Sequence, residues 1–285
     1  MAASLFATWF IWGSTYLAIK LTLPSLPPML GGAIRYLLAG LLMLSLARWR
    51  REPWPAWRET RHAAVAGGLA LAIGNGAVCL GAQRAPSGLV ALILAATPLF
   101  SVLINQLLGL KARPIEWLGV LLGLAGVGLI QQGASGFHDM LGLAIVLGGA
   151  LAWAVSAVIL PRLSMPTPLH ALAIQMLGGG LFSLLVSGAL GESWRAMPDR
   201  TAMLALLYLV FAGSLAGYSG YLWLLKHSRP ALATSFFCVN PLVALGLGAL
   251  WGGEAISRDM LGGIALVIAA VALVLYGSRP EAKAG

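Results

Sequence analysis

The chain has 285 residues, of which 59% are hydrophobic and only 9% are charged, with a mean hydropathy of +0.88 and a pI near 10.2. Soluble domains carry roughly 25% charged residues, so this composition excludes a soluble globular protein and predicts a polytopic helical membrane protein. The net charge of +9 is explained by the basic loops that orient membrane proteins, and no nucleic-acid partner is expected.

The first apolar segment, "MAASLFATWFIW", lacks a basic n-region and runs on to Leu23. It is therefore interpreted as a first membrane span rather than a cleaved signal peptide. Apolar runs between charged or Pro/Gly breaks predict ten spans in all. These spans are expected at residues 3–21, 28–47, 63–83, 87–109, 115–131, 140–160, 168–189, 202–225, 230–251 and 260–277.

Lysine and arginine are distributed unevenly between the loops that flank these spans. One side of the membrane takes twelve of them and the other takes five, which leaves Arg35 inside the second span. Since the side richer in basic residues faces the cytoplasm, both termini are expected to be cytoplasmic and the protein to lie in the inner membrane. The loop "RWRREPWPAWRETRH" carries more of these residues than any other loop and is interpreted as a topology anchor.

The second half of the chain repeats features of the first half. The segment "AIRYLLAGLL" at 33–42 resembles "AIQMLGGGLF" at 173–182, and Trp12 corresponds to Trp153 at a similar offset. Each half then contains five spans, and an odd number forces the second half to enter the membrane inverted. Inverted repeats are typical of transporters, with the site near the midplane between the halves. The expected halves are residues 1–135 and 136–285.

Two prolines also occupy equivalent positions in the two repeats. Pro241 follows Pro98 by 143 residues (241 − 98 = 143), and they fall near the middle of the ninth and fourth spans. Proline lacks an N–H and clashes with the carbonyl four residues back, so the carbonyls of Leu94 and Phe237 need another partner, supplied by protein or by a water-filled cavity. A static kink is one interpretation. The matched pair in inverted halves favours hinges for alternating access.

The duplicated ten-span pattern, opening with "IWGSTYLAIK", resembles the EamA-type family of the drug/metabolite transporter superfamily. The resemblance includes "AIRYLLAG", "APSGLVALILAATPLF", "RPALATSFFCVNPLVAL" and "LWGGEAIS", and covers essentially the whole chain. It implies an all-α membrane fold of ten transmembrane helices, arranged as two inverted five-helix repeats around a central cavity. It also implies, as is usual in that family, export of amino acids or other small metabolites.

Arg35 is the strongest single candidate for a site residue. An arginine inside a span is costly and usually faces a partner or a water-filled path. It is expected either to bind a substrate carboxylate through its planar fork or to form a structural ion pair with Glu254, which lies near the outer end of the ninth span. A gate pair that opens with substrate would combine the two interpretations.

Aromatic and polar residues complete the predicted substrate-binding cavity. Trp12 and Tyr16 lie on one face of the first span with Trp9, and Trp153 lies at the same depth in the sixth. They are expected either to wall the cavity or to pack against neighbouring helices. Polar side chains in lipid also act as contacts between helices, so both interpretations stay open for Asn75, Gln175, Tyr218, Tyr221 and Asn240.

Residues that would support other functions are missing from the spans. All nine acidic residues fall in loops or at span ends, the four histidines are scattered, and the two cysteines have no metal-ligand spacing. No catalytic residue, metal site or cofactor is therefore expected.

The leading hypothesis is an inner-membrane exporter of small metabolites, most plausibly amino acids or related zwitterions and anions. Its partners are a small-molecule substrate and the lipid bilayer, with a monomer expected and a dimer as the alternative. Export of amphipathic drugs through the same aromatic cavity is the alternative function. A membrane enzyme acting on a lipid-linked substrate, or a scaffold, is disfavoured because neither requires an inverted repeat.

Overall fold

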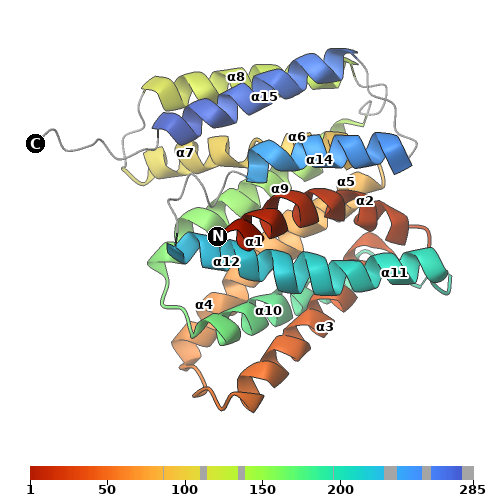
Figure 1. Ribbon diagram of the computed structural model, residues 1–285, viewed down its shortest axis with the longest axis vertical. Coiled ribbons are helices and arrows are strands. Elements are labelled where there is room, and N and C mark those ends of the chain that lie inside the picture. Colours follow the sequence, from red (N-terminus) through yellow and green to blue (C-terminus); the bar gives the residue numbers. More distant parts are fainter. Residues whose placement is uncertain are drawn as a thin grey trace, which may run out of the picture.

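The computed structural model describes residues 1–85, 87–109, 114–133, 139–194, 196–227, 236–251 and 258–277. In these residues all the regular secondary structure is helical (Figure 1). The first half contains α1 (Ala2–Phe6), η1 (Ala7–Ile11), α2 (Trp12–Thr22), α3 (Pro28–Trp49), α4 (Trp57–Gly67), η2 (Gly68–Asn75), α5 (Gly76–Ala82), α6 (Ser87–Leu94), α7 (Thr97–Leu107) and α8 (Pro114–Gly133). The second half contains α9 (Met140–Ile159), η3 (Leu160–Arg162), α10 (Pro168–Ala189), α11 (Arg200–Tyr208), η4 (Leu209–Gly217), α12 (Tyr218–His227), α14 (Phe236–Trp251) and α15 (Arg258–Gly277).

Six continuous helical runs are long and apolar enough to cross a membrane. They are Ala2–Thr22, Pro28–Trp49, Trp57–Ala82, Met140–Ile159, Pro168–Ala189 and Arg200–Leu224. Shorter apolar helices occupy Trp117–Gly126, Leu242–Trp251 and Leu261–Ala270. These helices make the chain an all-α membrane protein. The expected span 87–109 is divided between α6 and α7, and the first residues of the expected span 230–251 lie outside the described residues.

Several helices begin where the sequence supplies a proline or an acidic cap. Pro28 and Pro168 occupy the first turns of α3 and α10, where the missing N–H has no helical partner to lose. The Asp139 carboxylate accepts a hydrogen bond from the Leu141 N–H at the start of α9. Arg84 also donates to Asp139, and this hydrogen bond holds the pKa of the carboxyl below its ordinary value.

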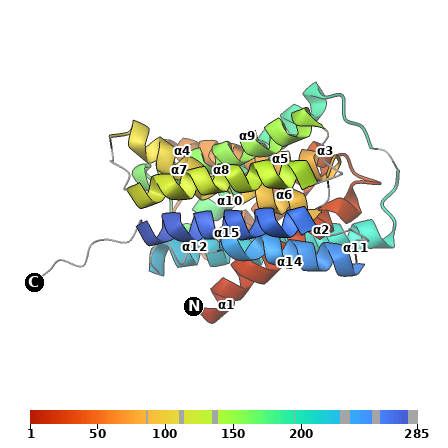
Figure 2. The ribbon, with the colours of Figure 1, turned by 90° about the horizontal axis from the view of Figure 1, so that it is seen from above.

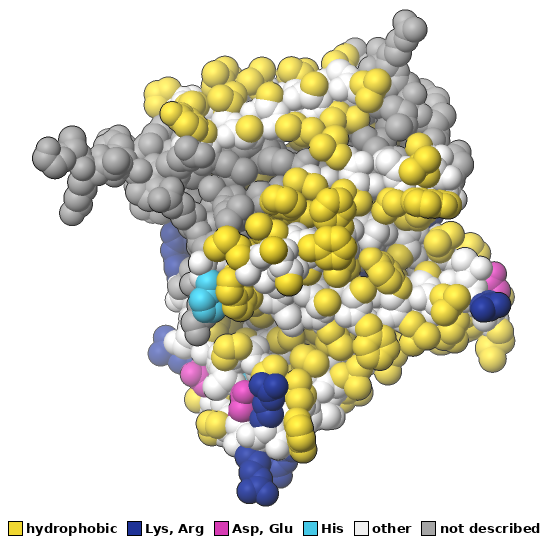
Figure 3. All heavy atoms as spheres, viewed as in Figure 1, with side chains coloured by type: hydrophobic (Ala, Val, Ile, Leu, Met, Phe, Trp, Pro, Cys, Tyr) yellow, Lys and Arg dark blue, Asp and Glu magenta, His cyan; other side chains and the backbone are white. Residues whose placement is uncertain are grey.

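Helices of the first half pack against helices of the second half. α3 lies along α10, α8 along α15, and α2 along α14. Both views show α8 and α15 side by side, and Figure 1 places them at one edge of the bundle (Figures 1 and 2). Apolar side chains cover much of the surface between the charged ends (Figure 3), as expected for a bundle surrounded by lipid.

The crossing of α3 and α10 is reciprocal. A Cβ added at Gly40 would lie 2.8 Å from Cγ of Leu177, and a Cβ added at Gly180 would lie 2.8 Å from Cγ of Leu37. Both pairs are related by the same offset of 140 residues (177 − 37 and 180 − 40). Glycine on both helices thus allows the backbones to approach closely, as small residues do in membrane helix pairs.

The two ends of the α3–α10 pair are closed by reciprocal loop carboxylates, called here the loop clamps of Glu192 and Glu52. The Glu192 carboxylate accepts hydrogen bonds from the Leu30 N–H at 2.8 Å and the Met29 N–H at 3.3 Å, at the start of α3. The Glu52 carboxylate accepts from the Thr167 hydroxyl at 2.5 Å and lies 3.2 Å from Nδ1 of His170 at the start of α10.

Each loop clamp follows a left-handed residue that ends the preceding helix. Arg51 has φ +55 after α3, and Gly191 has φ +66 after α10. The N–H groups of Glu52 and Glu192 then bond back to carbonyls in the last turns of these helices, at 3.1 and 2.9 Å. This arrangement is the Schellman type of helix ending. The reversed chain brings each glutamate to the first turn of the other helix.

Candidate functional site

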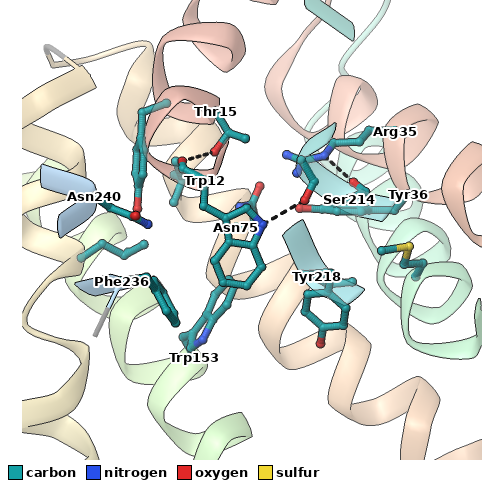
Figure 4. Close-up of a pocket in the computed structure, with 16 residues that line it drawn as sticks. Trp12, Thr15, Arg35, Tyr36, Asn75, Trp153, Ser214, Tyr218, Phe236 and Asn240 are labelled. Atoms are coloured by element: carbon teal, nitrogen blue, oxygen red, sulfur yellow. Dashed lines mark hydrogen bonds between the residues drawn. The ribbon is translucent and has the colours of Figure 1, made fainter. Parts of the chain in front are cut away.

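Residues from both halves of the chain form a cavity bordered by α2, α3, α9, α12 and α14 (Figure 4). About 540 Å³ of its volume is not filled by atoms, including space open to the outside. The enclosed space that water-sized molecules could occupy is only about 40 Å³, well below the roughly 300–1,000 Å³ typical of small-molecule sites. Seven of the eight sequence-predicted binding residues line it: Trp12, Tyr16, Arg35, Asn75, Trp153, Tyr218 and Asn240. The remaining one, Gln175, is buried and accepts a hydrogen bond from the Tyr218 hydroxyl at 2.7 Å.

Three π-helical segments position residues of this cavity. η1 ends immediately before Trp12, η2 ends at Asn75, and η4 ends immediately before Tyr218. A π turn adds a residue to the α-helical register and is frequent at functional sites. These wider turns were not predicted from the sequence, because an added residue in a turn leaves no distinct mark in an apolar run.

Arg35 lies in the wall of the cavity with its side chain largely withdrawn from solvent, at 5% exposure. Its Nε donates a hydrogen bond to the Ser214 hydroxyl at 2.8 Å, and its Cζ lies 5.0 Å from the centre of the Tyr36 ring (Figure 4). A Cβ added at Gly213 would meet the Arg35 Nη2 at 2.8 Å. The glycine in η4 therefore leaves room for the guanidinium.

Arg35 has no carboxylate partner among the described residues; the partner that the structure gives it is the neutral hydroxyl of Ser214. Glu254, the expected ion-pair partner, lies outside the described residues. The Nη1 of Arg35 and the hydroxyl of Tyr36 are both buried without a hydrogen-bond partner in the described part of the chain. Unsatisfied buried donors are costly and require an explanation.

Aromatic rings surround Trp12 on the other side of the cavity. Ring centres lie at 4.9 Å for Phe236, 5.4 Å for Tyr221, 6.0 Å for Trp153 and 6.2 Å for Tyr218. The Trp12 Nε1 donates to the carbonyl of Gly213 at 2.9 Å. These contacts fix the indole, so Trp12 and Trp153 both wall the cavity and pack against neighbours.

The two asparagines of the site differ in what they contact. Asn240 is buried, and with its amide oriented to satisfy the hydrogen bonds around it, its nitrogen donates to the carbonyls of Thr8 and Trp9, both at 2.9 Å. It therefore satisfies backbone carbonyls within the π turn of η1. Asn75 is only partly buried and faces the cavity, and the contact the structure gives it is a weak one with Sγ of Cys79 at 3.9 Å.

The helix is interrupted just before Pro98, whereas the helix that contains Pro241 is continuous. α6 ends at Leu94 and α7 begins at Thr97, with Pro98 in its first turn. As the sequence predicted, the Leu94 carbonyl has another partner, since the Thr97 hydroxyl donates to it at 2.6 Å. α14 runs continuously through Pro241 from Phe236 to Trp251.

Sequence reasoning missed the polar partner and part of the aromatic wall. Tyr36, Ser214 and Phe236 line the cavity, yet nothing in their local sequence distinguishes them from ordinary residues of apolar helices. Within the described chain, no group of three or more His, Cys, Asp and Glu side chains could hold a metal ion.

The sequence profile of the EamA-like transporter family matches residues 1–131 and 140–276. The "Uncharacterized inner membrane transporter YedA" of Escherichia coli K12 is 37% identical over 275 residues, covering 96% of this chain and 90% of the relative. The "Probable amino-acid metabolite efflux pump" of Salmonella typhimurium is 26% identical, covering 94% and 92%. A solved structure described as "Crystal structure of protein" superimposes with a TM-score of 0.67 at 22% identity, covering 95% of this chain and 96% of that chain, and so shows a shared fold.

Proposed function

The chain belongs to the EamA-like transporter family, and from that premise we propose that it exports small metabolites bearing a carboxylate, such as amino acids or related zwitterions and anions. The observation that carries this proposal is the buried Arg35 in the cavity wall, whose Nη1 has no partner in the described part of the chain. Relatives named as an inner-membrane transporter and an amino-acid metabolite efflux pump agree with an export role.

The proposed architecture has ten crossings in two inverted halves, residues 1–135 and 136–285, with both termini cytoplasmic. The reciprocal contacts of Gly40 and Gly180 support it, as do the loop clamps of Glu52 and Glu192. An approximate twofold axis in the membrane plane would exchange the members of each pair. Such an axis is the one that relates inverted repeats in transporters.

In the proposed cycle, the halves rock so that the cavity opens to each side in turn. Pro98 and Pro241 would act as hinges, and Arg35 with Glu254 would form the outer gate. The break before Pro98 supports this role for the first half. Because the Thr97 hydroxyl already satisfies the Leu94 carbonyl, bending there would expose no further unpaired backbone group.

The test is ligand-dependent thermal stabilisation of the purified protein in detergent with a panel of carboxylate metabolites. A ligand that binds the native state raises its apparent stability by mass action. Stabilisation is expected for the wild type, absent in Arg35→Ala, and unchanged in Arg58→Ala, an exposed arginine outside the cavity. Stabilisation by neutral amphipathic drugs alone, equal in all three proteins, would replace this proposal with drug export and give Arg35 a structural role.

A further inference from the structure

The two polar groups of the described site that lack a hydrogen-bond partner belong to consecutive residues. Arg35 and Tyr36 are consecutive residues of α3, both line the cavity, and the Arg35 Cζ is 5.0 Å from the Tyr36 ring centre. Arginine can only donate hydrogen bonds, and a phenol can donate one. The species that satisfies the Arg35 Nη1 and the Tyr36 hydroxyl together must therefore be an acceptor with at least one oxygen placed between them.

The charge balance of the described residues favours an anion as this acceptor. The described residues that line the cavity include no aspartate and no glutamate, so the buried guanidinium charge of Arg35 is not neutralised by them. A buried charge is strongly unfavourable unless it is paired, and the hydroxyl of Ser214 is neutral. A carboxylate supplies both the missing charge and the missing acceptor atoms.

Among the described residues, the aromatic side of the cavity offers no carboxylate for a positive group on the ligand. Two of its polar ends are already used within the protein, since Trp12 donates to Gly213 and Tyr218 donates to Gln175. The other described lining groups on this side are aromatic rings and neutral polar side chains such as Asn75. A desolvated ring face attracts an ammonium, but by less than the free energy that a buried ammonium loses with its water.

We propose that the preferred substrate is an organic acid with an aromatic or similarly bulky apolar body, recognised through its carboxylate by Arg35 and Tyr36, and that an α-ammonium group weakens binding. This inference rests on the proposed export function and narrows its substrate class from amino acids and anions to deaminated, amphipathic carboxylic acids. The apolar body would lie against the ring cluster around Trp12.

Three compounds with the same phenethyl body separate the contributions: 3-phenylpropionate carries a carboxylate, phenethylamine carries an ammonium, and L-phenylalanine carries both. Dissociation constants are measured for the purified full-length protein in detergent at pH 7 by calorimetry. We expect 3-phenylpropionate to bind at least ten-fold more tightly than L-phenylalanine, and phenethylamine to show no binding.

Tyr36→Phe removes the second unpartnered group while keeping the ring that packs in the wall. It is expected to weaken 3-phenylpropionate binding by three-fold or more. The matched control is Tyr208→Phe, because Tyr208 lies outside the cavity lining and its hydroxyl bonds to Ser14. Affinity in this control should equal that of the wild type.

Three outcomes would overturn all or part of the inference. L-phenylalanine binding as tightly as 3-phenylpropionate, with dependence on Arg35, would refute the preference for deaminated acids and leave the export proposal intact. Failure of both carboxylates to bind, together with failure of the wider panel of carboxylate metabolites, would refute both. An unchanged affinity in Tyr36→Phe would remove Tyr36 from carboxylate recognition.

Discussion

At the scale of single residues, the site depends on glycines that make room for large side chains. Gly213 lies against the guanidinium of Arg35, and Gly217 lies against the indole of Trp12. Both belong to the π-helical segment η4. The position of the charged group and the position of the central ring are therefore set by the same segment, which carries small residues at both contacts.

Replacing Gly217 with alanine is expected to destabilise the protein by about 1–3 kcal/mol, the usual cost of overpacking. The new Cβ would lie 2.2 Å from the Trp12 Nε1, and the indole cannot move aside because it bonds to Gly213 and is enclosed by rings. Thermal unfolding of the purified variant measures this effect. Gly148→Ala is the control, since a Cβ there meets nothing within 4 Å. Equal melting temperatures for the two variants would contradict the prediction.

The Arg35 site was predictable from sequence in part only. An arginine inside an apolar span stands out because its burial is costly, and the structure gives Arg35 a place in the cavity wall as that argument requires. Tyr36 and Ser214 gave no such signal, because tyrosine and serine are tolerated in membrane helices without a function. Their role depends on the approach of η4 to α3, which joins residues 179 positions apart (214 − 35 = 179).

At the scale of helices, the break before Pro98 illustrates how a proline is accommodated inside a span. The sequence predicted that the Leu94 carbonyl would need a new partner, and the Thr97 hydroxyl provides it. The same reasoning did not reveal the π turns of η1, η2 and η4, because their additional residue leaves the apolar pattern unchanged. Nor did it distinguish Pro98, which follows a break, from Pro241, which lies within a continuous α14.

Thr97→Val is expected to reduce stability by about 1–3 kcal/mol, the cost of leaving a buried acceptor unsatisfied. Thr97 is 1% exposed and valine has nearly the same shape, so the lost hydrogen bond to the Leu94 carbonyl is the main change. Thermal unfolding of Thr97→Val and Thr97→Ser measures it. The serine variant keeps the hydroxyl and should remain near the wild type; a loss as large as that of valine would point to packing instead.

Replacing the clamp carboxylates with amides should weaken both ends of the α3–α10 pair. Glu192→Gln removes a negative charge from the start of α3, where it accepts backbone hydrogen bonds, at an expected cost of roughly 0.3–1 kcal/mol. Glu52→Gln removes the charged partner of Thr167 and His170. Because the clamps lie at opposite ends, their effects on unfolding should add in the double variant. Strong non-additivity would show that the two ends are coupled through the helices.

At the scale of the whole molecule, the uneven distribution of charge predicts the orientation in the membrane. Trp54 lies in the basic loop that we expect in the cytoplasm, and Trp194 lies in a loop expected outside; both are at least half exposed. Single cysteines at these positions, in a chain with Cys79 and Cys238 replaced by serine, can be labelled in intact cells with a membrane-impermeant thiol reagent. Trp194→Cys should react and Trp54→Cys should not. The reverse pattern would invert the proposed topology.

The two loop clamps differ in when their glutamate is synthesised relative to the helix that it contacts. Glu52, which contacts side chains at the start of α10, exists before α10 is made. Glu192, which accepts from the first N–H groups of α3, follows Pro28 by 164 residues (192 − 28 = 164). At typical rates of about 5–20 residues per second, the ribosome needs roughly 8–33 s to supply it. During that interval the first half is inserted with an unfinished helix end. The start of α3 is therefore capped only after α9 and α10 of the second half have been made. A truncated chain that lacks Glu192 would leave α3 uncapped.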